Sequence, residues 1–210
     1  METCVCQEKR LKKEYKDPSG LPVMYINLTV PVTKGRVSFV SNTKKLYSGV
    51  FDGFLSYCET KVYKKALKEI KNDGFNPRGG VLKYTVSYED EQFFSTFIDA
   101  FVYNGKSRGK VARLSQVWSK DEGRLLNFYD FFSREDRETL ISLFLSSSRE
   151  NSQKGLWEYK NKVDSLIENN ADFSKFYLVP NGFAFYFDAG VLSPSPLPAV
   201  FITSYKAVNM

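Results

Sequence analysis

The stretch that decides the fold is residues 82–103, LKYTVSYEDEQFFSTFIDAFVY. Its first eight residues alternate apolar and polar side chains, which is the period of a strand. A polar turn then leads to residues 93–103, which are apolar on both faces, as in a central strand that is covered twice. Turn residues at 104–109 and a third run at 110–119 follow. The sequence therefore predicts an antiparallel meander.

Helical periodicity flanks this meander on both sides. Upstream, apolar residues recur every three or four positions over residues 39–72, with a lysine-rich opposite face at 61–71. This pattern predicts a long helix packed across the sheet. Downstream, the spacing predicts a helix over 134–146, a polar loop over 147–155 and a second helix over 157–169.

Three further segments have strand character. Residues 23–30 form a predicted strand that ends at Pro31, because proline has no amide donor for a sheet. A hairpin is predicted at 176–187 and a last short strand at 199–204. The predicted fold is thus α+β. It consists of a mostly antiparallel sheet, made of the meander and the late hairpin, with a long helix packed across it and a further helical pair.

Length and composition limit the possible functions. The 210 residues suit a basic lead-in at 1–20 and a single α+β domain at 21–206. Histidine is absent, which excludes histidine-dependent catalytic triads and histidine metal ligands. We therefore expect neither a metal nor a cofactor. The net charge of +6 comes from 30 basic and 24 acidic residues, a mild bias that is by itself no evidence for nucleic acid as a partner.

The cysteines and the N-terminus bear on the compartment. Cys4, Cys6 and Cys58 are expected to be free thiols, because an odd number cannot form a closed disulfide framework. There is no run of 18 apolar residues, so we expect no transmembrane helix. The first residues lack the apolar region of a signal peptide, which predicts a cytoplasmic protein for the chain as written. If the N-terminus has been trimmed, an extracytoplasmic location is the alternative.

One turn is the first candidate binding site. Its four candidate residues are Tyr103, Gly105, Lys106 and Arg108. Glycine permits a tight turn, and the two basic side chains next to an aromatic ring suit a carboxylate, a phosphate or an acidic protein patch. The alternative is an ordinary hairpin turn with charges that face solvent.

Two tyrosines of the late hairpin, Tyr177 and Tyr186, are the other candidates. Their rings are able to stack on a sugar, although alternating aromatic residues in a strand are also typical of a core. Asp130 and Asp188 are conceivable as an acid and base pair, but no spacing brings them together, and capping or turn roles are the better interpretation.

Four motifs occur in a recognisable order: Tyr57-Cys58-Glu59, residues 84–88 (YTVSY), residues 127–132 (NFYDFF) and an aromatic hairpin at 176–186. In this order and spacing, residues 23–205 resemble a domain of unknown function. It is shared by RsiV-type anti-sigma factors, which sense lysozyme, and by the non-catalytic N-terminal part of the peptidoglycan deacetylase PdaC. The resemblance implies a non-catalytic binding or sensor-like domain whose ligand is a protein, a glycan or another acidic molecule.

The chain departs from the family pattern in two loops. Where the family has a histidine in the turn after the second meander strand, this chain has Arg108, and Lys106 replaces a glycine. The Ser/Pro-rich loop at 189–196 lacks both tyrosines of the family pattern. We therefore expect an altered ligand specificity in a divergent member of the family.

Two other function classes stay open. One is a carboxylate-dependent enzyme that acts on glycans. The other is a module that binds polyanions or nucleic acid through the lysines at 61–71 and the basic run at 9–16. The lack of a nucleophile motif disfavours the enzyme, and we expect no catalytic activity. The lack of an aromatic and basic RNA-binding signature disfavours nucleic acid.

Overall fold

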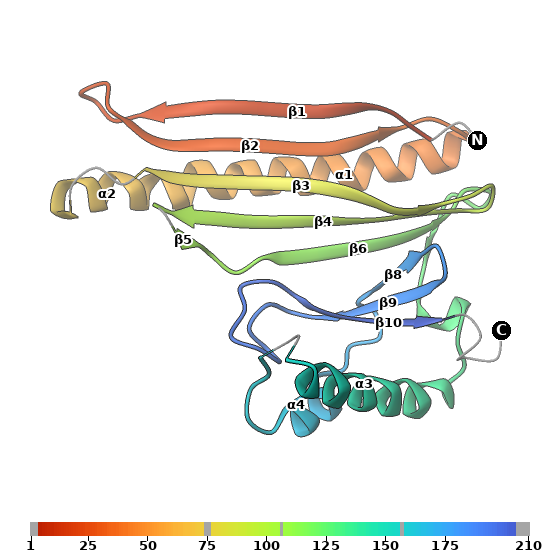
Figure 1. Cartoon of the computed structure of the whole chain (residues 1–210). Helices are drawn as coiled ribbons and strands as arrows, with labels where there is room; N and C mark the ends of the chain where they lie inside the picture. Colours follow the sequence, from red (N-terminus) through yellow and green to blue (C-terminus); the bar gives the residue numbers. More distant parts are fainter. Residues whose placement is uncertain (1–3, 74–76, 106, 156–157, 205–210) are drawn as a thin grey trace.

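The computed structural model describes residues 4–73, 77–105, 107–155 and 158–204. Within these residues the fold is α+β, as predicted, but the strands form two sheets, and the late hairpin is not part of the sheet that holds the meander (Figure 1). The larger sheet contains β1 (Val5–Lys16), β2 (Pro22–Thr33), β3 (Arg78–Glu89), β4 (Phe93–Asn104), β5 (Ser107–Arg108), β6 (Ala112–Ser119) and β7 (Leu125–Leu126). Their order is β1-β2-β3-β4-β6-β7, and β5 pairs with β4. All neighbours are antiparallel except β2 and β3, which are parallel.

The predicted meander is confirmed as β3, β4 and β6, in which Asp99 of β4 lies opposite Arg113 of β6. The prediction that Pro31 ends its strand is wrong, because β2 continues to Thr33 along β1. Pairing between β2 and β3 stops at Leu28. The missing amide of Pro31 therefore costs no ladder hydrogen bond on that side.

The predicted long helix is also confirmed. It runs as α1 (Val37–Tyr57), a π-helical turn η1 (Cys58–Val62) and α2 (Tyr63–Asp73) across one face of the large sheet (Figure 1). Its buried stripe consists of Phe39, Thr43, Tyr47, Phe51, Cys58, Val62 and Ala66. The wider π turn keeps positions that are four apart on the buried side, so the stripe continues into α2.

The basic segment within residues 1–20 forms the edge strand β1 of the large sheet. Its lysines that face the long helix are neutralised there. Lys9 pairs with Asp52 at 2.9 Å, and Lys13 pairs with Glu59 at 3.3 Å. Part of the basic run therefore has a structural explanation, which is contact with acidic residues of the helix.

The second sheet comprises β8 (Phe176–Val179), β9 (Gly182–Phe187) and β10 (Ala199–Ser204), which include the predicted hairpin and the last strand. It packs on the face of the large sheet opposite α1. In β9, Ala184 and Tyr186 face the large sheet, whereas Phe183, Phe185 and Phe187 face α3 (Asp136–Gln153) and α4 (Val163–Asn170). The layers are therefore helix, large sheet, small sheet and helices (Figure 1).

The later helices differ from the prediction. Helix α3 (Asp136–Gln153) continues through the segment predicted to be a loop, and α4 (Val163–Asn170) begins later than expected. The polar run was misleading because Ser148 is fully buried and its hydroxyl donates to the carbonyl of Leu145. A serine whose hydroxyl is hydrogen-bonded to a carbonyl of its own helix can pack in a core like any other small residue.

Candidate functional site

The predicted basic turn is only partly within the described residues. Tyr103 is half-buried at the end of β4, and its ring lies edge-to-face 5.3 Å from the ring of Phe101. Gly105 has a φ of +57°, as the turn chemistry predicted. Arg108 belongs to β5, whose backbone pairs with Tyr103, whereas Lys106 lies outside the described residues. A ligand role for this turn stays a prediction.

The two candidate tyrosines lie between the sheets. Tyr177 is 7% exposed and Tyr186 is 4% exposed. The hydroxyl of Tyr186 donates to the carbonyl of Arg113 at 3.1 Å, and the hydroxyl of Tyr177 is 3.4 Å from the Arg113 guanidinium. The structure thus places both rings in the interlayer core, which is the alternative that their alternation left open.

Arg113 and Asp99 form a buried ion pair at the centre of this contact. Two hydrogen bonds of 2.8 and 2.9 Å join them, and the guanidinium lies 4.0 Å from the centre of the Phe97 ring. Burial acts to lower the pKa of Arg113, but the hydrogen bonds and charge of Asp99 outweigh it and raise the pKa. The guanidinium therefore stays charged, and through Tyr177 it joins β4 and β6 to the small sheet.

The two conceivable catalytic carboxylates have separate structural partners. Asp130 caps the short helix η2 (Phe128–Asp130) and pairs with Arg124 at 2.8 Å. Asp188 pairs with Lys175 at 2.6 Å. The capping role expected for Asp130 is confirmed.

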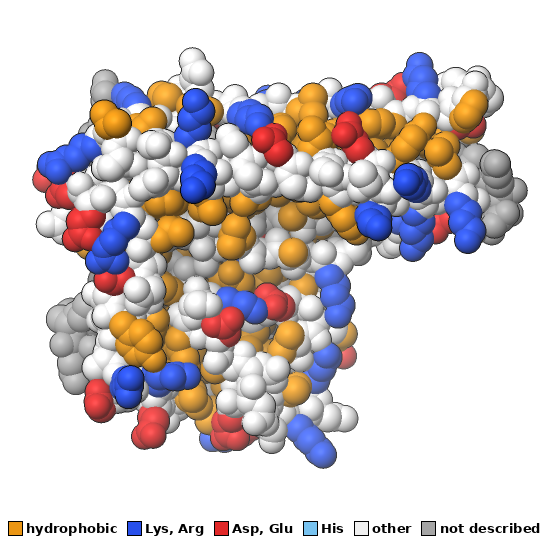
Figure 2. Space-filling view, turned by 180° about the vertical axis from the view of Figure 1, so that it is seen from behind, with side chains coloured by type: hydrophobic (Ala, Val, Ile, Leu, Met, Phe, Trp, Pro, Cys, Tyr) orange, Lys and Arg blue, Asp and Glu red, His pale blue; other side chains and the backbone are white. Residues whose placement is uncertain are grey.

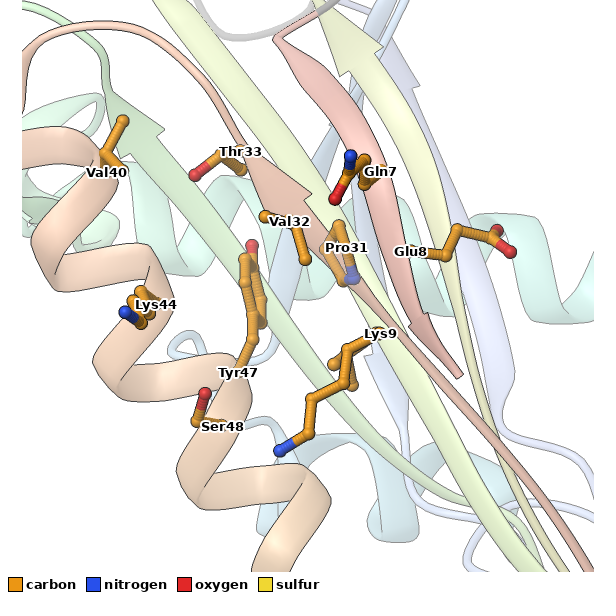
Figure 3. A pocket seen from close by; sticks show the side chains of 11 residues that line it. Gln7, Glu8, Lys9, Pro31, Val32, Thr33, Val40, Lys44, Tyr47 and Ser48 are labelled. Carbon is orange, nitrogen blue, oxygen red and sulfur yellow. The ribbon is translucent and has the colours of Figure 1, made fainter. Parts of the chain in front are cut away.

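A cavity that the sequence analysis missed lies between α1 and the β1–β2 hairpin (Figure 3). Its volume is about 500 Å³. Its lining residues are Gln7, Glu8, Lys9, Val30, Pro31, Val32, Thr33, Val40, Lys44, Tyr47 and Ser48. Positions 44, 47 and 48 of α1 follow position 40 at helical spacings of three and four residues, so they share one side of the helix, and this spacing is the signal that the sequence offered for the site.

The floor of this cavity is uncharged. Tyr47 is 1% exposed, and its hydroxyl bonds to Thr96 at 3.0 Å and accepts from Nε1 of Trp118 at 3.2 Å. Burial raises the pKa of Tyr47, so the phenol stays neutral. The apolar side chains of Val30, Pro31, Val32 and Val40 also line the cavity.

The positive charges of this site stand at its rim. Figure 3 shows Lys9 reaching from β1 toward Ser48 of α1. Lys9 lies 4.2 Å from the centre of the Phe51 ring and is paired with Asp52. Lys44 is exposed and makes no ion pair with any residue that the structure describes. The site can therefore hold an apolar group against its floor and an anion at its rim.

Across residues 4–73, 77–105, 107–155 and 158–204, no cluster of three or more His, Cys, Asp or Glu side chains has the arrangement of a metal site. In the same part of the chain, no helix combines the length and apolar character needed to cross a membrane.

No family model matches the sequence, and no curated protein matches it. Several solved structures share the fold, and two of them are DUF3298 family proteins. A DUF3298 family protein from Bacteroides fragilis has a TM-score of 0.63 and 13% sequence identity, and the match covers 98% of this chain and 93% of that one. A DUF3298 family protein from Pseudomonas aeruginosa PAO1 has a TM-score of 0.59 and 12% identity, with 97% and 92% covered. What is shared is the fold.

Proposed function

We propose that this chain is a non-catalytic binding module whose ligand site is the cavity between α1 and the β1–β2 hairpin. The observation that carries the proposal is an apolar hollow of about 500 Å³ with basic groups at its rim. Pockets that bind small molecules have this size and this combination of an apolar lining with a few polar groups.

The lining favours a ligand with an apolar body and one anionic end. The neutral Tyr47 ring and the surrounding valines suit a hydrocarbon or ring system. The ammonium of Lys44 has no carboxylate partner among the described residues, so a ligand anion gains an ion pair there without displacing one.

A sensor role is supported by the position of the cavity and by the resemblance to RsiV-type domains. One wall is the edge strand β1, and the opposite wall is α1. A ligand that contacts both walls stabilises the state in which the edge strand lies against the helix. Binding is thereby coupled to the position of β1.

The test uses anilinonaphthalene sulfonate, a fluorescent probe with apolar rings and one anion, and competition by decanoate and by decanol. The native protein should bind the probe, and decanoate should displace it better than decanol does. Val40→Trp should fill the cavity and weaken probe binding by about tenfold or more, a change of 1.4 kcal/mol. Val50→Trp is the matched control, because Val50 is half-buried on the same helix but does not line the cavity.

Lys44→Ala should reduce the affinity for decanoate and leave that for decanol unchanged. Equal probe binding by the Val40→Trp and Val50→Trp variants, with both shown to be folded by circular dichroism, would exclude this cavity as the site.

A further inference from the structure

A second surface lies on the other side of the long helix, and it is independent of the cavity. We call it the β6-side flank, and its members are Leu46, Val50, Phe54, Tyr57, Lys61, Lys64 and Lys68. Successive members are three or four residues apart, so they follow one side of the helix. A hydrogen bond of 2.8 Å from Nδ2 of Asn42 to the carbonyl of Gly123 turns this side toward β6 and β7.

The first half of the flank is apolar and accessible. Tyr57 is 49% exposed at its end, next to the ring of Phe54 at 6.1 Å. Across from it, Leu114 of β6 and Leu125 of β7 are 43% and 44% exposed. Their partners Ile98 and Trp118 belong to the core under the helix, so both leucines lie on the helix side of the sheet. Figure 2 shows hydrophobic side chains as a band in the concave angle below α1.

The second half of the flank carries uncompensated positive charge. Lys61, Lys64 and Lys68 are exposed, and none pairs with a carboxylate of the residues that the structure describes. The flank itself contains no acidic residue. Two lysines of β1 differ in this respect, since Lys9 and Lys13 are paired with Asp52 and Glu59 of the helix. Figure 2 shows basic side chains gathered at one end of the hydrophobic band.

We propose that the β6-side flank docks an acidic amphipathic helix of another protein. The distance from Leu46 to Lys68 along the helix is about 33 Å at 1.5 Å per residue, which matches a partner helix of about 20 residues. Its apolar half would lie between the flank and Leu114, and its acidic half beside the three lysines. Charge complementarity of this kind sets the orientation of the partner and its rate of association.

An added strand is a poorer fit than a helix at this place. The carbonyls of Arg113 and Leu114 in β6 already accept hydrogen bonds from the Tyr186 hydroxyl and from Nε2 of Gln116, at 3.1 and 3.0 Å. A second copy of this chain would leave its lysines unneutralised. A flat bilayer cannot reach a band that lies in a concave angle (Figure 2).

The test measures fluorescence anisotropy of a labelled helical peptide of about 20 residues, with leucines at helical spacing in one half and glutamates in the other. The peptide should bind, and a version with lysine in place of glutamate should bind at least about tenfold more weakly. Replacing Lys61, Lys64 and Lys68 by glutamate should also weaken binding of the glutamate peptide by about tenfold or more. Affinity should fall as the salt concentration rises.

The matched control replaces Lys12, Lys83 and Arg134 by glutamate, which changes the net charge equally at other exposed positions. This control variant should bind the peptide as the native protein does. Leu114→Asp should weaken binding, and Val40→Trp, which fills the cavity, should not. The last comparison separates failure of this proposal from failure of the cavity proposal.

Equal loss of binding in the two triple variants would overturn the proposal. The proposal would also be overturned if the protein did not bind the acidic peptide and instead sedimented with phosphatidylglycerol vesicles, was retained on DNA or self-associated.

Discussion

At the scale of single residues, burial makes the pair of Asp99 and Arg113 sensitive to substitution. Asp99→Ala leaves a buried guanidinium without its partner. The free energy of unfolding should fall by about 3–5 kcal/mol, measured by urea denaturation.

The control for this prediction is Asp121→Ala, because the pair of Asp121 with Arg36 is exposed. This substitution should lower the free energy of unfolding by at most about 1 kcal/mol. The double variant Asp99→Leu with Arg113→Met should recover much of the loss, since it leaves no buried charge. If Asp99→Ala and Asp121→Ala lower the free energy of unfolding equally, the buried pair of Asp99 and Arg113 contributes no more stability than a surface pair does.

The thiol of Cys58 gives a second prediction at this scale. Burial, with a smaller contribution from the charge of Glu59, raises its pKa from 9.0 to about 11. Because the folded pKa lies above the unfolded one, the stability from this thiol is complete below pH 9.0 and is lost as the pH rises through about 11. Unfolding free energies measured in reducing buffer should therefore decline across this window.

Cys58→Ala should make that decline shallower, although not flat, because burial also raises the pKa of Cys4 and of Tyr84 to about 12. Cys6→Ala should leave the slope unchanged, since Cys6 is exposed. A slope that is identical in the native protein and in Cys58→Ala would contradict the assignment.

At the scale of elements, a glycine of the long helix and a glycine of the sheet have opposite effects on stability. Gly49 lies in the exposed interior of α1 with no atom near the place of a Cβ. Gly49→Ala should raise stability by about 0.5–1 kcal/mol, because alanine loses less conformational entropy in a helix. A Cβ on Gly80 of β3 would lie 2.5 Å from Sγ of Cys58, so this glycine lets the helix approach the sheet.

Gly80→Ala should accordingly lower the thermal midpoint, whereas Gly49→Ala raises it. Differential scanning fluorimetry of the two variants measures both shifts. If Gly80→Ala is neutral, the helix can move away from β3 at no cost.

At the scale of the whole molecule, we expect the two sheets to unfold in one transition. The core around the small sheet includes Val117 of β6 and Phe128, so it extends into the large sheet. Phe183→Ala in β9 should cost about 3–5 kcal/mol and shift a single unfolding transition. Circular dichroism reports on the whole chain, and fluorescence of Trp118, in a Trp157→Phe background, reports on the large sheet.

Both signals should move together in Phe183→Ala. A Trp118 transition that stays at its original temperature while the circular dichroism transition shifts would show that the layers unfold separately.

The sequence by itself determined the α+β class, the meander and the long helix. These features depend on periodicity among residues that are close in the chain. The meander follows from the alternation at 82–89, and the long helix follows from apolar positions three or four residues apart from Phe39 onward. The capping of η2 by Asp130 was also local, and it was predictable for the same reason.

Only the tertiary structure decided which surfaces are exposed. Tyr177 and Tyr186 alternate as a surface platform would, yet a second sheet covers them. Pro31 was read as a strand end, because the sequence does not say that β3 diverges from β2 after Leu28. The cavity and the β6-side flank lie on opposite sides of one helix. Which side meets β1 and which meets β6 depends on contacts between residues far apart in the chain, and no local pattern encodes them.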